Sequence, residues 1–384
     1  MPYPPFRGDK LKIYHLAKEL SKKHELHLIT IAETVEDISY VENLKPYFKK
    51  IDFIYLPKYK SIINTVCGVF NSDPFQLNYF RSREFQKLLD KKLSENEFDG
   101  IHVQHIRMSQ FFRKNTDFKR VILDLPDAFS LYWKRRSNNS TNTLNKVFEK
   151  IEYKRVKKLE IDFVSQFKKV LVCSLEDQLY LESLGLNQVD ILENGVDTTM
   201  FKPSEAPYIP YRILFTGNMD YAPNVDAVVY FTAEIWPKIR KEVPHAKFII
   251  AGQRPVAKVL ALQSDSVEVT GFIEDLSKEY AKAHVVVSPL RIGAGTQNKV
   301  LEALAMNIPV VTTNVGYTGL KLKRDEGALV SLSANEFADN TIKLLKDPDF
   351  RDSVGYKGGE SIRSRFGWSG IAQKLENYFI ELKH

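Results

Sequence analysis

The sequence predicts an α/β protein made of two doubly wound domains with parallel sheets, and three observations support this. Apolar runs of strand length alternate with helical patterns along almost all of the 384 residues, which is typical of parallel sheets with crossover helices. The strand candidates are continuous apolar runs, as expected when helices cover both faces of a sheet. A segment with three prolines and no helical period, 193–212, separates two halves of similar size.

Each half contains six segments with the length and composition of strands. Those of the first half are 25–31, 51–56, 100–104, 121–125, 169–174 and 189–193. Those of the second half are 212–217, 247–252, 267–271, 284–289, 308–313 and 327–331. Amphipathic segments such as 9–23 lie between many of them, and 365–382 has the pattern of a final helix.

We therefore expect two Rossmann-like domains, 1–195 and 196–365, followed by a helix in 366–384. A doubly wound domain normally opens with a strand. This chain opens with the loop-like MPYPPFRGDK instead, so the first strand of the first domain is expected to be missing.

The composition is that of an ordinary globular protein, with 43% hydrophobic and 27% charged residues. No apolar run approaches the roughly 20 residues of a membrane-spanning helix, and the first residues do not read as a secretory signal. The two cysteines match no metal or redox spacing. These features lead us to expect a cytoplasmic protein.

The net charge of +7 is concentrated in 101–170, where 16 Lys and Arg face 7 Asp and Glu. One interpretation is a solvated helix face. Another is attraction to an anionic membrane surface, which would make the protein peripheral at the inner face of the plasma membrane, or to a diphosphate-bearing acceptor. We do not expect nucleic acid as a partner, because no nucleic-acid-binding motif is present.

Ligands of doubly wound sheets bind outside the carboxyl ends of the strands, and one such strand end is rich in small residues. The strand 284–289 is followed by Arg291 and by the small residues Gly293 to Gly295, and a helix begins near Thr296. Glycines let a ligand approach the backbone, and the free amides of a helix start attract anions.

Lys299 and Glu302 are three residues apart on this helix and project from the same side. The lysine could neutralise a phosphate, and the glutamate could accept the hydroxyl protons of a ribose. The alternative is a glycine-rich turn followed by a helical Lys–Glu ion pair.

Further loops follow other predicted strands. Gly217 and Asn218 come after the first strand of the second half, and Gly8 precedes the first helix. Either could be a plain turn or a place where the backbone meets a phosphate. His105 and Asp127 lie just beyond two strands of the first half. They could deprotonate or orient an acceptor hydroxyl, or they could be structural.

The segments SPLRIGAGTQNKVLEALAMNIPVVTT, FTGNMDYAPNVDAV, AGQRP, VEVTGFIEDL and ILENGVD resemble the retaining glycosyltransferases of family 4, which have the GT-B fold. The chain is most similar to the bacterial members that act in exopolysaccharide and surface-glycan assembly. The resemblance implies that the second domain binds a nucleotide-diphosphate sugar and that the first domain holds a glycan or lipid-linked acceptor, with a cleft between them. It also implies that the last helix crosses back to the first domain, and that no metal or other cofactor takes part.

The resemblance also assigns roles to residues. Glu302 would bind the ribose of the donor, while Lys299, with the backbone of Gly295 and Thr296, would hold the diphosphate. Gly8 and Gly217 would lie against phosphates and sugar, and Gly271 and Phe272 would flank the base. The candidate catalytic residues are His105, Asp127 and Lys299. The candidate donor-binding residues are Gly8, Gly217, Asn218, Arg254, Gly271, Phe272, Arg291, Gly293, Gly295, Thr296, Lys299 and Glu302.

The sequence departs from the family pattern in two places. Many members have a glutamate where this chain has Ala294, so another group would have to recognise the sugar hydroxyls. Many also have an Arg and a Lys on the loop 217–224, which contains neither here. Lys299, Arg291 or Arg254 would then supply the positive charge.

Two other functions remain open at this stage. One is a nucleotide-sugar epimerase on the same fold, although the sequence shows few charged groups around the expected sugar site. The other is a non-catalytic partner subunit, for which the absent glutamate and first strand would argue. A dinucleotide oxidoreductase is disfavoured, because no G-x-G-x-x-G follows a strand.

Overall fold

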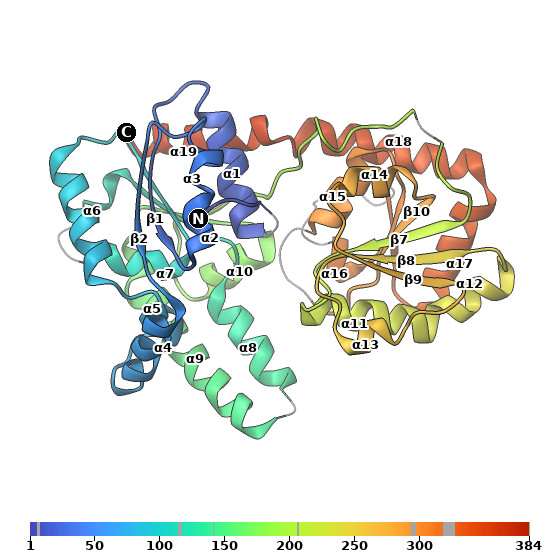
Figure 1. The fold of residues 1–384 in the computed structure, drawn as a ribbon, viewed down its shortest axis with the longest axis horizontal. Coiled ribbons are helices and arrows are strands. Elements are labelled where there is room, and N and C mark those ends of the chain that lie inside the picture. The colour runs from blue at the N-terminus through green and yellow to red at the C-terminus, as the bar shows by residue number, and fades with distance from the viewer. Residues whose placement is uncertain are drawn as a thin grey trace. The chain divides into compact units, whose positions relative to one another are not determined.

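A computed structural model describes residues 1–5, 8–113, 117–140, 142–205, 207–292, 297–317 and 327–383. The chain divides into two compact α/β units (Figure 1). Unit 1 contains 1–194 and 368–384, and unit 2 contains 195–367. The chain therefore passes between the units twice. A hydrogen bond connects the two segments of unit 2 that lie next to these crossings: the amide of Val196 donates to the carbonyl of Phe366 over 2.8 Å.

The strands of unit 1 are all parallel and fall into two sheets. The first sheet pairs β1 (His27–Ala32) with β2 (Lys50–Tyr55). The second has the order β3 (Ile101–Gln104), β4 (Val121–Leu125), β5 (Lys169–Val172) and β6 (Val189–Ile191). In the doubly wound order 3-2-1-4-5-6, the opening strand lies between the second and the fourth. If the expected opening strand is counted as the first, β1 and β3 are the second and the fourth. The break between the two sheets of unit 1 therefore lies where the opening strand would be.

The helices of unit 1 cover its sheets and extend beyond them on one side. They are α1 (Gly8–Leu20), α2 (Val35–Ser39), α3 (Val41–Leu44), α4 (Lys58–Cys67), α5 (Phe75–Tyr79), α6 (Arg83–Glu95), α7 (Ile106–Ser109), α8 (Phe129–Asn139), α9 (Thr143–Asp162), α10 (Leu175–Ser183) and α19 (Trp368–Lys383). Short 3₁₀ turns are η1 (Gly68–Phe70), η2 (Gln110–Phe112), η3 (Phe118–Arg120) and η4 (Val164–Gln166). None of the helices in the described ranges is long and apolar enough to cross a bilayer.

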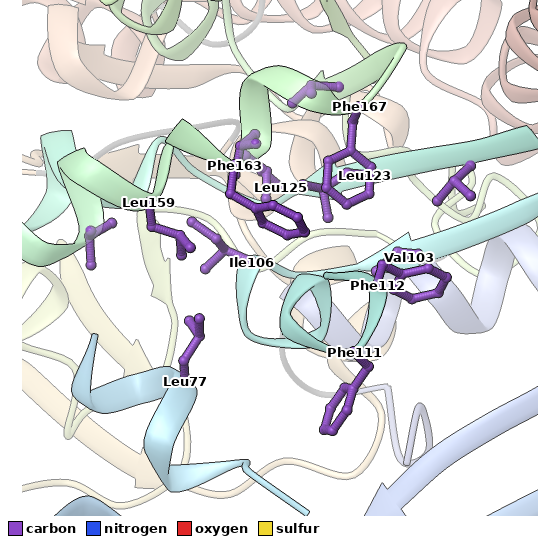
Figure 2. Packing of buried hydrophobic residues seen from close by; sticks show 14 of the residues in the cluster. Leu77, Val103, Ile106, Phe111, Phe112, Leu123, Leu125, Leu159, Phe163 and Phe167 are labelled. Carbon is purple, nitrogen blue, oxygen red and sulfur yellow. The ribbon is translucent and has the colours of Figure 1, made fainter. Parts of the chain in front are cut away.

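The main core of unit 1 lies on one face of the β3–β6 sheet. Figure 2 shows Leu123 and Leu125 of β4 among the phenyl rings of Phe163 and Phe167. The opposite face of β4 is covered by α1 and α19, where Ile122 packs with apolar residues of both helices. The last helix therefore belongs to unit 1. Burying both faces explains why these strands are continuous apolar runs.

Unit 2 has one parallel sheet with all six strands predicted from its half of the sequence. They are β7 (Arg212–Thr216), β8 (Lys247–Ala251), β9 (Val267–Gly271), β10 (Val285–Ser288), β11 (Val310–Thr313) and β12 (Ala328–Ser331). Their order is β12-β11-β10-β7-β8-β9. The direction of winding thus reverses between β7 and β10, and such a switch point is where doubly wound sheets bind ligands.

The helices of unit 2 enclose this sheet (Figure 1). They are α11 (Ala222–Tyr230), α12 (Trp236–Glu242), α13 (Ala257–Leu260), α14 (Leu276–Ala281), α15 (Asn298–Ala305), α16 (Asn314–Tyr317), α17 (Ala334–Lys346) and α18 (Pro348–Arg365), with a π-helical turn, η5 (Phe231–Ile235), between α11 and α12. Two buried clusters fill the two faces of the sheet. The start of the predicted linker packs into unit 2, because Phe201 is buried against the ring of Tyr280.

Candidate functional site

Three glycines follow the three strands on one side of the switch point, and their backbones are in direct contact. The amide of Gly217 donates to the carbonyl of Ala251 over 3.0 Å, and the amide of Gly252 donates to the carbonyl of Gly271 over 3.0 Å. A Cβ atom at Gly252 would lie 1.7 Å from the carbonyl oxygen of Gly217, so no side chain fits there. Gly271 has a φ of +74°, which favours glycine. The result is a glycine-lined strand edge, where main chain packs directly on main chain.

Two amide side chains fix the loop that follows β7. The Nδ2 of Asn224 donates to the carbonyl of Asn218 over 3.0 Å. The Nε2 of Gln253 donates to the Oδ1 of Asn218 over 2.8 Å. Asn224 also closes over the first glycine, since a Cβ at Gly217 would lie 2.6 Å from its Nδ2. The loop after β7 is therefore tied both to α11 and to the loop after β8.

Lys299 enters this site from α15, on the other side of the switch point. Its Nζ donates to the Oδ1 of Asn224 over 2.8 Å and lies 4.5 Å from the centre of the Phe215 ring. The side chain is buried, and burial lowers the pKa of Lys299 from its ordinary 10.5 to about 7. A lysine with this pKa can take up a proton when an anion arrives.

Glu302 lies on the next turn of α15 and has a different partner. The hydroxyl of Tyr280, from α14, donates to its Oε2 over 2.9 Å. The same hydroxyl is 2.6 Å from the Oγ1 of Thr216, at the end of β7. Burial raises the pKa of Glu302 and raises that of Tyr280 well above its usual value. Lys299 and Glu302 thus have separate partners, Asn224 and Tyr280, in place of the helical ion pair considered above.

Two polar atoms near the start of α15 add to this picture. The Oγ of Ser288, the last residue of β10, and the Oδ1 of Asn298, the first residue of α15, are buried and have no hydrogen-bond partner within the described ranges. Gly293, Ala294, Gly295 and Thr296, which the sequence places between them, lie outside the described residues.

The two arginines considered as alternative phosphate ligands are engaged elsewhere. The guanidinium of Arg291 binds the carboxylate of Asp226 and lies 4.5 Å from the ring of Tyr230, both on α11. Arg254, whose φ is +55°, donates to Asp220 over 3.2 Å. Phe272 follows Gly271 and is exposed. Lys299, in contrast, contacts the loop after β7 directly through its hydrogen bond to Asn224.

In unit 1, His105 follows β3 and has a strained backbone. Its φ of +79° is rare outside glycine. Its amide donates to the carbonyl of Asp124 over 2.8 Å, and its ring lies 4.3 Å from that of Phe129. The preceding residue, Gln104, has a side-chain amide whose buried atoms meet no partner among the residues described. Strained backbone and unsatisfied buried polar groups tend to occur at functional sites.

A cluster of charged and polar side chains surrounds Asp124 of β4, which is buried. The Nζ of Lys12, on α1, lies 2.8 Å from the Oδ1 of Asp124 and donates to the carbonyl of Leu192 over 2.9 Å. The Nε2 of His102 lies 3.1 Å from the other carboxylate oxygen. Burial opposes both charges, but their attraction outweighs it, so the pKa of Lys12 is raised and that of Asp124 is lowered. This pairing anchors α1 to the sheet.

The remaining predicted residues of unit 1 lie at element boundaries. Asp127 is partly buried in the turn between β4 and α8, and Gly8 is the first residue of α1. In the described part of the chain, no group of three or more His, Cys, Asp or Glu side chains is placed to hold a metal ion.

Comparisons with known proteins give the site a chemical context. Residues 210–347 match the family of glycosyl transferases group 1. This glycosyltransferase domain comprises β7 to β12 and therefore the whole switch point.

Two curated relatives were also found, one over the full length and one over half of it. The chain is 22% identical over 382 residues, 95% of its length and 94% of the other, to an uncharacterized 44.6 kDa protein in the cps region of Klebsiella pneumoniae. It is 27% identical over 216 residues, covering 50% of this chain and 55% of the other, to the GDP-mannose-dependent alpha-(1-6)-phosphatidylinositol monomannoside mannosyltransferase of Mycobacterium tuberculosis.

Among solved structures, that of Anabaena HepE in complex with UDP and glucose is similar, with a TM-score of 0.68, 12% identity, and coverage of 98% of this chain and 96% of the other. The fold is accordingly GT-B, and the findings together support a glycosyltransferase.

Sequence reasoning missed Asn224, Gly252 and Tyr280. A polar residue in the first turn of the apolar helix 222–230 is a signal that could have pointed to Asn224. Tyr280 gave no signal, because a tyrosine in an amphipathic helix usually belongs to the core.

Proposed function

We propose that the protein is a retaining glycosyltransferase of family 4 that transfers a sugar from a nucleotide-diphosphate sugar to a hydroxyl of a glycan or lipid-linked acceptor. The observation that carries this proposal is the convergence of Gly217, Lys299 and Glu302 on the switch point of unit 2. A glycine-lined backbone edge, a buried lysine of low pKa and a positioned carboxylate suit the binding of a nucleoside diphosphate.

Each group has a role in this proposal. The diphosphate approaches the strand edge at Gly217 and Gly252, and Lys299 takes up a proton and neutralises it. Glu302, held by Tyr280, accepts hydrogen bonds from the ribose hydroxyls. When the bond between the anomeric carbon and the diphosphate oxygen breaks, negative charge develops on that oxygen. A preorganised cation at this point stabilises the transition state more than the ground state.

The acceptor is assigned to unit 1. His105 and Asp127 would orient its hydroxyl, whose oxygen forms the new bond to the anomeric carbon while its proton passes to the departing diphosphate. Gln104, with its unsatisfied amide, is a further candidate for binding acceptor hydroxyls. We propose that no metal is needed, because Lys299 supplies positive charge at the diphosphate.

The relatives support a place in cell-surface glycan synthesis. One is encoded in a cps region, and another is a GDP-mannose-dependent mannosyltransferase. We propose that this chain also acts on a bacterial surface polysaccharide or its lipid-linked precursor, from the cytoplasmic side.

Two measurements test the proposal. Nucleoside diphosphates and their sugars are screened by thermal shift, since a ligand that binds the native state raises its apparent stability. The stabilising donor is then incubated with acceptor glycans, and the anomeric configuration of the product is read by NMR. Retention of configuration is expected. Donor conversion without any acceptor would instead indicate an epimerase, and no stabilisation by any nucleotide would contradict the proposal.

A further inference from the structure

The helix α4 exposes its apolar side to solvent, the reverse of what is usual for a helix on a globular domain. Its apolar residues are spaced as one helical face, yet Tyr59, Ile62, Ile63 and Val66 are all exposed. The side turned toward the protein carries Ser61, which is fully buried. Surface helices normally bury their apolar stripe. An exposed apolar stripe marks a surface that is covered by something else.

The turn after α4 continues this exposure. In η1, Val69 is exposed and the phenyl ring of Phe70 is 92% exposed. An isolated exposed phenylalanine would be unremarkable. Here it extends a row of exposed apolar residues that already spans the whole of α4.

The first half of α9 shows the same reversal in a second element. Leu144, Val147, Phe148 and Ile151 occupy one face and are exposed, with Leu144 at 81%. The buried side of this half carries Glu149 and Glu152, and farther along the helix Glu160 is buried beside Val156 and Leu159. Each of these glutamates accepts a hydrogen bond from inside unit 1: from Arg136, from the amides of Phe75 and Gln76, and from the amide of Ser130, respectively.

Two contacts link α9 to the segment that follows α4. The ring of Phe148 is stacked on that of Phe75, the first residue of α5, at 5.0 Å. The guanidinium of Arg155 donates to the carbonyls of Gly68, the first residue of η1, and of Asp73. Figure 1 shows α4 and the α8–α9 pair extending on the same side of unit 1. We call this the α4–α9 surface: Tyr59, Ile62, Ile63, Val66, Val69, Phe70, Leu144, Val147, Phe148 and Ile151.

Exposed cations surround this surface. Lys58 and Lys60 lie on α4, which contains no acidic residue, and Lys150 and Lys154 lie on α9 beside the apolar stripe. A depression on the flank of α4 is lined by three cations, Lys60, Arg81 and Arg83, and by one acid, Glu84. Arg81 is also paired with Asp73, so cations still outnumber acids there. The three buried glutamates of α9 are directed away from the exposed side. The charge at the rim is therefore positive.

We propose that the α4–α9 surface docks unit 1 onto an anionic lipid bilayer. The apolar side chains enter the boundary between headgroups and acyl chains, and the lysines and arginines remain at the level of the lipid phosphates. A second copy of the chain fits this surface less well. In a two-fold dimer the same patch meets itself, so lysines of one copy would face lysines of the other.

The docking is tested by co-sedimentation with vesicles of phosphatidylcholine and phosphatidylglycerol, compared with phosphatidylcholine alone. No donor or acceptor is needed, so the result is independent of the proposed transferase activity. The wild type is expected to sediment with the anionic vesicles and to be released partly by salt, because exposed charges are screened. I62E/I63E is expected to lower the partition coefficient at least tenfold. L179E, at a similarly exposed leucine on α10, is the matched control and should leave it unchanged.

A second readout does not depend on sedimentation. Cys67, at the end of α4, is exposed, whereas Cys173 is buried. A polarity-sensitive fluorophore on Cys67 should shift its emission to shorter wavelength with anionic vesicles. K150E/K154E should weaken this response.

Four outcomes would overturn the proposal. They are no sedimentation of the wild type, equal sedimentation of I62E/I63E, equal binding to neutral vesicles, or a dimer in light scattering that I62E/I63E dissociates without any vesicle binding.

Discussion

Replacing Lys299 by methionine should make the unliganded protein more stable while abolishing donor binding. The pKa of Lys299 falls from 10.5 to about 7 on folding. Each pKa unit corresponds to about 1.4 kcal/mol, so keeping this lysine buried costs the folded state roughly 4 kcal/mol at pH 7. Methionine has a similar stem but no charge. It forfeits the hydrogen bond to Asn224, which is worth about 1 kcal/mol. The net expectation for K299M at pH 7 is a stabilisation of about 2–3 kcal/mol.

The pH dependence gives this prediction a definite sign. Between pH 7 and pH 10 the unfolded chain holds a proton on Lys299 that the folded protein has largely lost, so wild-type stability rises with pH in that window. The advantage of K299M should therefore shrink by about 2 kcal/mol between pH 7 and pH 9. Below pH 7 both states are protonated and the difference becomes constant.

The assay is urea unfolding of the wild type and K299M at pH 7 and pH 9, followed by fluorescence. K238M, at an exposed lysine of α12, is the control and should change stability little at either pH. A K299M protein that is less stable than the wild type at pH 7, or whose difference does not vary with pH, would refute the reasoning. In donor titrations, wild-type affinity should fall as pH rises above 7, because binding takes up a proton.

Three further predictions concern other parts of the molecule. Y280F removes the hydroxyl that contacts Glu302 and Thr216, and should weaken donor binding about tenfold in calorimetry, about 1.4 kcal/mol; unchanged affinity would remove Tyr280 from the site. Because φ at His105 is +79°, H105G should be more stable than H105A by about 1 kcal/mol in thermal unfolding, whereas alanine is usually more stabilising than glycine. Both variants should lose turnover if the imidazole acts on the acceptor. K12M leaves Asp124 buried without its cation and should cost about 3–5 kcal/mol, of which K12M/D124N should recover a large part; equal losses in the single and double variants would contradict the pairing.

The strands were predictable because they are buried on both faces. All of the segments proposed as strands are strands, with ends that differ by at most two residues. A strand such as 121–125, in which every residue is buried, can form only in the middle of a sheet that is covered on both faces. The last helix was predictable for the same reason, since Trp368, Ile371 and Leu375 form its buried side.

Which side of α4 and of α9 is buried was not predictable from the spacing of their apolar residues. The residues Leu144, Val147 and Ile151 have the spacing of a buried stripe, but in the structure the opposite side of α9 is buried. Its glutamates find partners only because the start of α5, the start of α8 and Arg136 lie there. The burial of Lys12 likewise depends on Asp124, which is more than a hundred residues away. The periodicity of apolar residues carries no information on pairs that are so far apart in the sequence.

The candidate site was predictable in its outline. Gly217, Lys299 and Glu302 follow strand ends, and a doubly wound sheet brings such ends together. Their partners were not predictable, since Tyr280 and Asn224 contact them only once the register of α11 and α14 on the sheet is fixed. Sequence reasoning left a Lys299–Glu302 ion pair open as the alternative, whereas the structure gives each side chain its own partner.

The central claim is that the donor nucleotide binds at the switch point of unit 2. The most direct test is a crystal structure of the full chain with the nucleoside diphosphate that stabilises it most. The account predicts ribose hydroxyls on the carboxylate of Glu302 and a phosphate oxygen within hydrogen-bond distance of the Nζ of Lys299. A nucleotide bound at any place that leaves both side chains without contact would contradict it.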